Sequence, residues 1–547
     1  MDNFEIVIFI MTILIVLSTF TDKIKLPYPI LLVAVGLVIG FVPFLPNLAL
    51  DPDIVFLIFL PPLLYDAAFK TSWLDFKKEI GTISTLAVTL VFFTTVSVAV
   101  AAHYFIPGFS WPLAFLLGAI ISPPDAVAAT SITKGLGLNR KVITIIEGES
   151  LVNDSSALIA YRYALTAIMS GTFVLWKAGL EFLLMAAGGI ALGLGIGYIM
   201  VFAHKTIKDS PIVETSLSLL TPFLAYLLAE RSHVSGVLTV VTAGLLISWR
   251  AREVFSFQTR LQTNAVWSTV IFLMNGIVFI LIGLQLPEII KSLDKSVLLQ
   301  LAWHGLIISL VTIIIRILWV FGGAYHQRIF FRKRSDDTGD TEPISWKNVL
   351  IVAWTGTRGV VSLAAALALP LTLRNGTPFP QRHAILLLAF IVIFVTLVVQ
   401  GLTLPLLIRV LRIKPEVRRQ KQEEDDLQLT LTENTVHFID RDFPLELDDK
   451  VLDQLKKQYG FNYNLLSKKN TGDRSEQRQY MSQLNYINDL LSSQLEIIKF
   501  QRELLLKFHT EGTFSDETIT KAERDLDIEE LRLNTMLEKG GANSPVA

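Results

Sequence analysis

Long apolar runs recur through the first three quarters of this chain, with short polar segments between them. A bilayer core about 30 Å thick needs roughly 20 apolar residues in each spanning helix. By this measure we predict thirteen spans, at residues 4–20, 28–44, 53–69, 81–105, 111–133, 142–170, 173–203, 211–229, 233–249, 262–287, 297–327, 347–371 and 383–411. The pattern is typical of an all-α polytopic membrane protein.

Positive charge alternates between successive loops. Counted together with the first five residues of the span that follows, loops after odd-numbered spans carry 18 Lys and Arg residues, and loops after even-numbered spans carry 6. Because retained loops concentrate Lys and Arg on the cytoplasmic side, we expect an outside N-terminus, a cytoplasmic C-terminus and a place in the plasma (inner) membrane. The first span lacks the basic leading region and small-residue cleavage site of a signal peptide, so we expect it to be retained.

Composition separates two domains. Hydrophobic residues make up 52% of the chain and the mean hydropathy is +0.52, too apolar for a soluble enzyme. Within residues 413–547, however, 45 of 135 residues are charged. We therefore predict a transmembrane domain at 1–412 and a cytoplasmic, mainly helical, regulatory tail at 413–547. The chain has no cysteine, which excludes disulfides and thiolate metal sites.

The tail contains one long predicted helix, at residues 477–509. Its apolar positions recur at steps of three and four residues: Met481, Leu484, Ile487, Leu491, Leu495, Ile498 and Leu505. Such a face needs a partner, which would be the tail's own helices, a second subunit or a regulator. Self-packing is the default, and the sequence identifies no tail ligand. Four arginines just inside the membrane are expected to meet anionic lipid headgroups: Arg409, Arg412, Arg418 and Arg419.

Two spans are interrupted at matching positions. Thirteen spans divide into six, one and six, which is how two inverted repeats around a linking helix would be built. The fifth span is broken by Ser122-Pro123-Pro124-Asp125, and the twelfth by Gly356-Thr-Arg-Gly359. Paired breaks indicate a transporter's binding site, because freed carbonyl groups and helix ends there can face an ion.

Several ionisable residues lie inside the predicted spans, where each costs roughly 2.5 to 3.5 kcal/mol at the bilayer centre. They are Asp66, Asp125, Glu147, Glu149, Asp154, Arg162, Arg316 and Arg358. Each needs a partner, a wet cavity or a function.

The sixth span carries the densest polar cluster. Ser150 and Asp154 are four residues apart and share a helix face, beside Asn153. This all-oxygen surface suits a small hard cation such as Na⁺ or Li⁺. Glu149 points about 140° away from Asp154, and we predict a structural ion pair between Glu149 and Arg316.

Asp154 has no basic residue within a turn on its own helix, so it is available to exchange a proton for a metal ion. Burial favours the protonated form of a carboxyl group, which lets protons and cations compete for one site. One carboxylate that crosses the membrane with either ion, but not empty, would exchange one cation for one proton. The chain has neither a Walker lysine loop nor a His-Glu-x-x-His sequence, and we expect no cofactor and no nucleic-acid partner.

Three motifs give the chain its resemblance to the sodium/proton exchangers of the monovalent cation/proton antiporter family. They are the double-proline segment Phe59 to Phe69, the segment Glu147-Gly-Glu-Ser-Leu-Val-Asn-Asp154, and Gly356-Thr-Arg-Gly359 with Val399 to Thr403. They span most of residues 1–412 in the family's order, and the tail lies outside the match.

The resemblance implies a homodimer in which a six-helix core, with crossed broken helices 5 and 12, slides against a scaffold. Asp154 would carry the ion and the proton, with Ser150 and Asp66 as coordinators or gate. The Asn153-Asp154 pair implies electroneutral exchange.

Many relatives have Thr-Asp-Pro at the first break, whereas Pro124 precedes Asp125 here. Coordination near Asp125 would therefore depend on the carbonyl groups of Ser122 and Pro123. Tyr65 and Arg358 are assigned to packing or gating.

Three other functions fit parts of the sequence. A K⁺/H⁺ exchanger would use the same site, and a cation channel would pass current without moving protons. An intramembrane aspartyl protease would use two membrane aspartates as an acid/base pair. The chain lacks the protease's Gly-x-Gly-Asp motif, which leaves the protease as a remote alternative.

Overall fold

The computed structural model describes residues 3–24, 27–41, 57–125, 138–171, 175–207, 210–291, 293–330, 345–373, 376–413, 417–441, 456, 474–511 and 516–541. Regular structure in these ranges is helical, apart from an isolated β-bridge between Thr372 and Pro378. The chain divides into two compact units, Met1–Glu416 and Val417–Ala547, with the boundary four residues beyond the predicted one.

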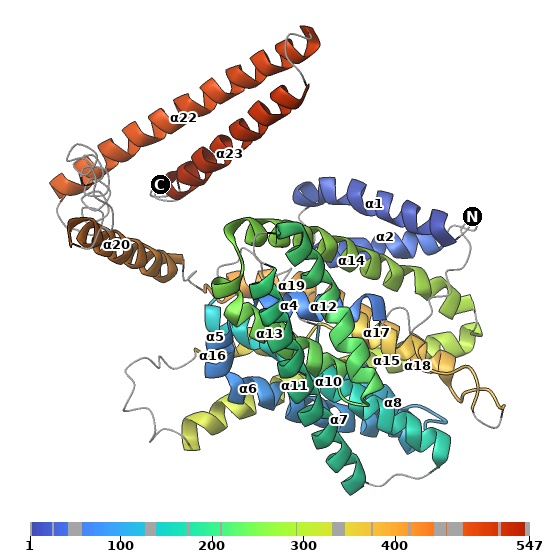
Figure 1. Ribbon diagram of the computed structural model, residues 1–547. Helices are drawn as coiled ribbons and strands as arrows, with labels where there is room; N and C mark the ends of the chain where they lie inside the picture. The colour runs from blue at the N-terminus through green and yellow to red at the C-terminus, as the bar shows by residue number, and fades with distance from the viewer. Residues whose placement is uncertain are drawn as a thin grey trace. The chain divides into compact units, whose positions relative to one another are not determined.

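The first unit contains most of the helices (Figure 1). They are α1 (Asn3–Ile24), α2 (Tyr28–Gly40), α4 (Leu60–Lys70), α5 (Trp73–Lys78), α6 (Ile80–Ser84), η1 (Thr85–Leu90), α7 (Val91–Phe105), α8 (Trp111–Ile121), α10 (Arg140–Ser170), α11 (Leu175–Thr206), α12 (Pro211–Arg231), α13 (Gly236–Val254), α14 (Phe257–Lys291), α15 (Lys295–Phe330), α16 (Trp346–Trp354), α17 (Val360–Leu367), α18 (Arg382–Val395), η2 (Thr396–Gln400) and α19 (Gly401–Val410).

Six helical stretches among the described residues are long and apolar enough to cross a membrane. They are Ile80–Phe105, Gly179–Thr206, Pro211–Arg231, Phe257–Pro287, Lys295–Ala324 and Arg382–Val410. Shorter apolar helices cover Ile8–Thr19, Tyr28–Gly40 and Trp111–Ile121. The first and last of the six contain the π-helical turns η1 and η2, so each is one continuous helix with a local widening.

α10 is long enough to span but contains many polar residues. It packs against α8, η1, α7 and α13, and also against α16 from the second half of the chain. Protein therefore surrounds the polar face of α10, and Glu149, Asn153 and Asp154 are buried. A helix in this position does not need the hydropathy of a lipid-facing one.

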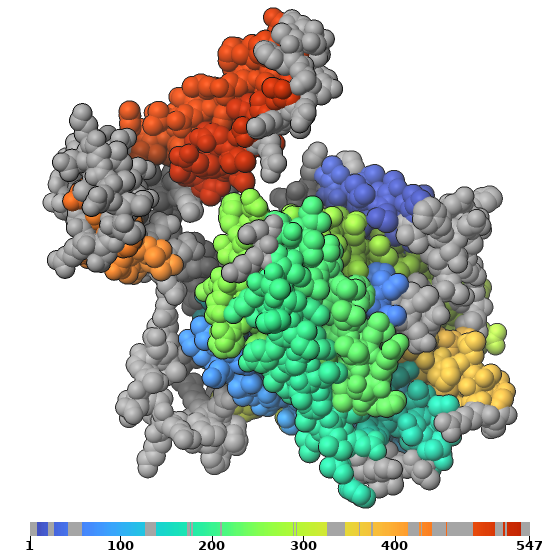
Figure 2. Space-filling view, viewed as in Figure 1, coloured from blue at the N-terminus to red at the C-terminus, as the bar shows by residue number. Residues whose placement is uncertain are grey.

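α11 shows the opposite distribution, with an apolar outer face. Figure 2 shows α11 with its neighbours α12 and α13 forming much of one side of the first unit. Trp176, Leu183 and Phe202 on α11 are each more than 60% exposed. On the side that faces α13, α11 carries glycine in place of larger side chains. A Cβ on Gly193 would lie 2.6 Å from the Thr239 carbonyl oxygen of α13. Close backbone contact between these two helices therefore requires glycine.

The two interrupted spans have different shapes. α8 ends at Ile121, and the chain is non-helical at Ser122–Asp125. The remainder of the predicted span 111–133, from residue 126, lies outside the described residues. The predicted span 347–371 divides into α16 and α17, joined by the non-helical residues 355–359.

The second unit contains α20 (Val417–Arg441), α22 (Arg474–Glu511) and α23 (Asp516–Gly541). α22 and α23 lie side by side as a helical hairpin (Figure 1). Leu491 and Ile498 of α22 and Leu533 of α23 are buried between them. The predicted helix at 477–509 is thus confirmed, and part of its apolar face packs within the tail.

Candidate functional site

The two chain breaks meet through reciprocal hydrogen bonds. The backbone N–H of Asp125 donates to the carbonyl of Thr357 at 2.6 Å. The Thr357 hydroxyl donates in return to the carbonyl of Asp125 at 3.2 Å. Asp125 and Thr357 are 232 positions apart, and each donates a hydrogen bond to the carbonyl group of the other. These bonds satisfy backbone groups at the breaks, where helical hydrogen bonds are missing.

Charged side chains match the helix ends at this meeting point. The Arg358 Nε–H donates to the carbonyl of Ile121 at the end of α8 at 3.1 Å, and its Nη1 donates to the carbonyl of Gly356 beyond the end of α16. The carboxylate of Asp125 lies beside Gly359, which directly precedes α17. A cation thus sits at two helix C-termini and an anion at one N-terminus, as the helix dipole favours.

Gly359 leaves the space that this arrangement needs. A Cβ added at Gly359 would lie 1.7 Å from Oδ2 of Asp125. No side chain larger than hydrogen fits there without moving the carboxylate.

α10 brings a second carboxylate to the break. Asp154 is 5% exposed, and it lies close enough to Asp125 for their charges to interact. The Asn153 side-chain amide donates to the carbonyl of Pro124 at 2.8 Å. Its Oδ1 is buried and has no hydrogen-bond partner in the described structure. An acceptor left without a donor beside two carboxylates is a ready ligand for a cation.

Glu149 and Arg316 form a bidentate ion pair. Arg316 Nη1 lies 2.5 Å and Nη2 lies 2.8 Å from the two Glu149 oxygens, and both residues are 1% exposed. Nη2 also donates to the carbonyl of Val352 on α16 at 3.1 Å. The contact ties α10 to α15 and α16, on a side of α10 that is turned about 140° from Asp154.

Asp66 and Tyr65 lie on α4 and have other neighbours. Asp66 accepts a hydrogen bond from Lys70 one turn later at 2.7 Å. No hydrogen bond or ion pair within the described residues joins Asp66 to Asp154. Tyr65 is 1% exposed and packs against the Trp267 ring, with centroids 5.2 Å apart.

The other predicted residues lie on α10 and at the end of α8. Ser150 is half-buried one turn before Asp154. Ser122 and Pro123 are buried beside the break, and the Ser122 hydroxyl donates to the Ala119 carbonyl at 3.2 Å.

Two threonines of the site are absent from the sequence prediction. Thr357 could have been predicted from the sequence, because it lies inside the Gly356–Gly359 motif at the second break. Thr396, whose Oγ1 accepts the Arg358 backbone N–H at 3.1 Å, lies in an apolar run that carries no signal.

A second buried acid was also absent from the prediction. Glu214 of α12 is 1% exposed, and its Oε2 lies 3.8 Å from Nδ1 of His204 on α11. The Thr259 hydroxyl of α14 donates to Glu214 Oε1 at 3.2 Å. These residues lie at the ends of their helices, where sequence does not distinguish a buried acid from a loop charge.

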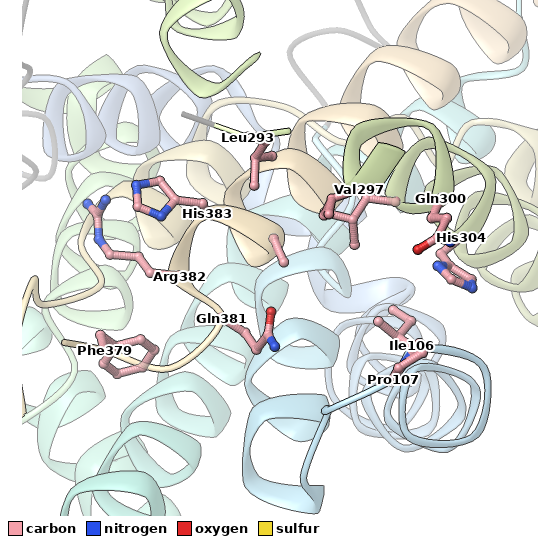
Figure 3. A pocket seen from close by; sticks show the side chains of 12 residues that line it. Ile106, Pro107, Leu293, Val297, Gln300, His304, Phe379, Gln381, Arg382 and His383 are labelled. Atoms are coloured by element: carbon pink, nitrogen blue, oxygen red, sulfur yellow. The ribbon is translucent and has the colours of Figure 1, made fainter. Parts of the chain in front are cut away.

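A cavity of about 300 Å³ opens elsewhere, at the start of α18 (Figure 3). Gln300 and His304 of α15 lie on one side of it, across from Arg382 and His383 of α18. None of the predicted ion-binding residues lines this cavity. It is therefore separate from the cluster around Asp154.

A buried carboxylate, Asp154, beside the place where the end of α8 meets the break between α16 and α17 is typical of secondary transporters. Residues 8–410 match the family described as sodium/hydrogen exchanger, transmembrane, and this chain belongs to that family. Its members are transporters rather than enzymes.

Three relatives are 28% to 34% identical to this chain over their aligned residues. A sodium, potassium, lithium and rubidium/H⁺ antiporter of Bacillus pumilus is 32% identical over 393 residues, 70% of this chain and 58% of its own length. The Na⁺/H⁺ antiporter ApNhaP of Aphanothece halophytica is 34% identical, over 70% of this chain and 68% of its own. The uncharacterized Na⁺/H⁺ exchanger YjcE of Escherichia coli is 28% identical over 96% of this chain and 98% of its own.

A solved structure shows the same fold. The sodium proton antiporter MjNhaP1 of Methanocaldococcus jannaschii matches with a TM-score of 0.58 and 20% identity, over 74% of this chain and 97% of that one.

Proposed function

We propose that this protein exchanges one Na⁺ or Li⁺ for one H⁺ across the membrane, with both ions competing for Asp154. Membership of the sodium/hydrogen exchanger family supports the reaction class. The observation that carries the assignment is the charge interaction between Asp154 and Asp125, beside an Asn153 Oδ1 that has no hydrogen-bond partner among the described residues. A buried carboxylate beside a half-buried one needs a compensating positive charge.

The charges of the cluster support a one-for-one exchange. Its described ionisable groups are Glu149, Arg316, Asp125, Asp154 and Arg358, with the charge of Arg358 also acting on the Glu149–Arg316 pair. Three carboxylates and two guanidinium groups leave one negative charge in excess. One proton or one monovalent cation makes the cluster neutral, and a neutral cluster crosses a low-dielectric region at least cost.

Each residue would have a distinct part. Asp154 would hold the proton or the cation, and Asn153 would offer Oδ1 while its amide holds the Pro124 carbonyl. Asp125, Ser122 and Pro123 would complete an oxygen shell at the break, with Ser150 one turn away on α10. Glu149 and Arg316 would hold α10 in place, and Arg358 would hold the two half-helices together.

Asp66 would act at the entrance rather than beside the ion. Asp66 forms an ion pair with Lys70, and the charge of Lys70 also acts on Glu147 of α10. These interactions support a gate beside Glu147. Tyr65 would be a packing residue in the aromatic cluster with Trp267.

The transport cycle and assembly extend this proposal. Thirteen spans in two inverted six-helix repeats would place the N-terminus outside and the tail in the cytoplasm of the plasma (inner) membrane. The core that carries the breaks would move as an elevator against a scaffold in a homodimer. The alternation of Lys and Arg between loops supports this orientation. Such a protein would serve pH and sodium homeostasis.

K⁺ is the second candidate cation. The printed name of the Bacillus pumilus relative includes potassium and rubidium besides sodium and lithium. A K⁺/H⁺ exchange at the same residues would obey the same charge count, so only an ion comparison separates the two.

The test is proton flux in vesicles that contain the purified protein. An imposed pH gradient should collapse on adding Na⁺ or Li⁺, without an applied voltage, and a panel with K⁺ and Rb⁺ should rank the cations. Current without proton movement would instead indicate a channel and overturn the proposal.

A further inference from the structure

α22 of the tail carries two apolar faces. One packs on α23 through Ile487, Leu491 and Leu495, and it ends in ion pairs from Arg502 to Asp527 and Glu530. α23 is therefore the partner of this face within the described part of the tail.

The second face points away from α23. It consists of Tyr486, Leu490, Ser493, Ile497, Phe500 and Leu504, which we name the α22 seam. Tyr486 is 71% exposed, Ile497 56% and Phe500 59%. Their steps of four, three, four, three and four residues place all six in one stripe along the helix.

The seam follows the heptad pattern of a two-stranded coiled coil. Leu490, Ile497 and Leu504 occupy a positions, and Tyr486, Ser493 and Phe500 occupy d positions. Side chains at these positions insert between those of a facing helix with the same period. A second copy of α22 has that period.

The residues beside the seam select the direction of the partner. The g positions are acidic, at Asp489, Glu496 and Glu503, and the e positions include Gln494 and Gln501. In a parallel pair, each g residue meets the e residue five positions later on the other helix, so Asp489 meets Gln494 and Glu496 meets Gln501. An antiparallel pair would instead set acid against acid.

The same acidic row argues against a lipid surface as the occupant. Helices that lie on membranes carry Lys and Arg beside their apolar face. Asp489, Glu496 and Glu503 would be repelled by anionic headgroups.

We propose that the α22 seam pairs in parallel with the α22 seam of a second copy of this chain, joining two tails. This inference is independent of the proposed ion exchange. It places Ser493 opposite Ser493 of the second copy, at the centre of the contact.

The chain's lack of cysteine makes the test direct. Ser493→Cys should form a disulfide-linked dimer of the full-length protein in membranes under mild oxidation, because d positions face each other in a parallel pair. The neighbouring Ser492 is exposed but turned about 100° from the seam, so it is the matched control. We expect about tenfold more linked dimer for Ser493→Cys than for Ser492→Cys. The proposal is overturned if Ser493→Cys forms no linked dimer, which is the result expected if the seam binds α20 or lipid instead. It is also overturned if Ser493→Cys and Ser492→Cys form equal amounts of linked dimer.

A second pair of variants separates the seam from mere proximity of two tails. In the Ser493→Cys background, Leu490→Glu places a charge in the seam and should abolish the linked dimer. Leu506→Glu makes the same change at a leucine that is 63% exposed off the seam, and it should leave the dimer unchanged. Linking that survives Leu490→Glu would overturn the proposal. The helical content of both variants should match that of the parent.

Discussion

The side-chain amide of Asn153 donates to the backbone carbonyl of Pro124 at 2.8 Å, so α10 is fastened to the break after α8. The bond uses the nitrogen of Asn153 and leaves Oδ1 buried, with no donor for it in the part of the chain that the structure describes. One residue thereby positions the break and offers an oxygen beside Asp154. In the proposed exchange, a change of ion at Asp154 would reach the end of α8 through its neighbour Asn153.

Asp154→Asn should insert and fold normally but catalyse no exchange at any pH. An amide retains the size of the side chain but neither takes up the transported proton nor supplies the negative charge. Proton flux in vesicles is the measurement, with equal amounts of protein verified after reconstitution.

The matched control is Asp75→Asn, at a half-buried carboxylate of α5 that is paired with Arg140. It should exchange at the parent rate, since it lies outside the buried cluster. Measurable exchange by Asp154→Asn would show that the ion is carried elsewhere.

Arg316→Ala should lower the thermal stability of the protein strongly. Removing one partner of a buried ion pair leaves the other charge uncompensated, at a cost of about 3 to 5 kcal/mol. Glu149→Ala combined with Arg316→Ala should cost less than the sum of the single changes, because neither charge then remains. Thermal unfolding in detergent measures all three. An Arg316→Ala protein as stable and active as the parent would mean that the pair is dispensable.

Gly359→Ala should abolish exchange, because the new Cβ would meet the Asp125 carboxylate at 1.7 Å. The clash displaces either Asp125 or the start of α17, and both belong to the site. Gly195→Ala on α11 is the control, since nothing lies within 4 Å of its added Cβ. There alanine should be neutral or stabilise the helix by up to about 1 kcal/mol. Normal exchange by Gly359→Ala would show that the space beside Asp125 is unused.

Thr357 offers a finer test of the contact between the breaks. Thr357→Val removes the hydroxyl that donates to the Asp125 carbonyl, and Thr357→Ser retains it. A net hydrogen bond contributes about 1 kcal/mol, so we expect roughly a fivefold loss of exchange for valine. Serine should remain close to the parent rate. Equal rates for valine and serine would assign Thr357 to packing alone.

The family's fold was predictable because its signals are local and periodic. Apolar runs located the long helices, and proline or glycine marked both breaks at Ser122 and Gly356. The contacts between the breaks were less accessible, because Asp125 and Thr357 lie 232 residues apart and no local rule pairs them.

The neighbours of one predicted residue, Asp66, were less accessible from the sequence. Spacing on α10 could indicate Asn153 and Asp154, but the neighbours of Asp66 depend on how α4 packs. There Lys70, on the same helix face, meets the carboxylate. Sequence indicated that Asp66 needs a partner and did not say which one.

Exchange by this protein should be insensitive to membrane potential. The cluster of Glu149, Arg316, Asp125, Asp154 and Arg358 carries one excess negative charge, so one Na⁺ or one H⁺ makes it neutral in either direction. No net charge then crosses the membrane in a full cycle, whereas each moved elementary charge would respond to 100 mV with about 2.3 kcal/mol. The measurement is the rate of proton flux in vesicles with potassium gradients and valinomycin that set the voltage to zero or to either sign, in a preparation shown not to transport K⁺. A rate that follows the imposed voltage would show that a second proton moves per cycle, and that a group outside these five takes part.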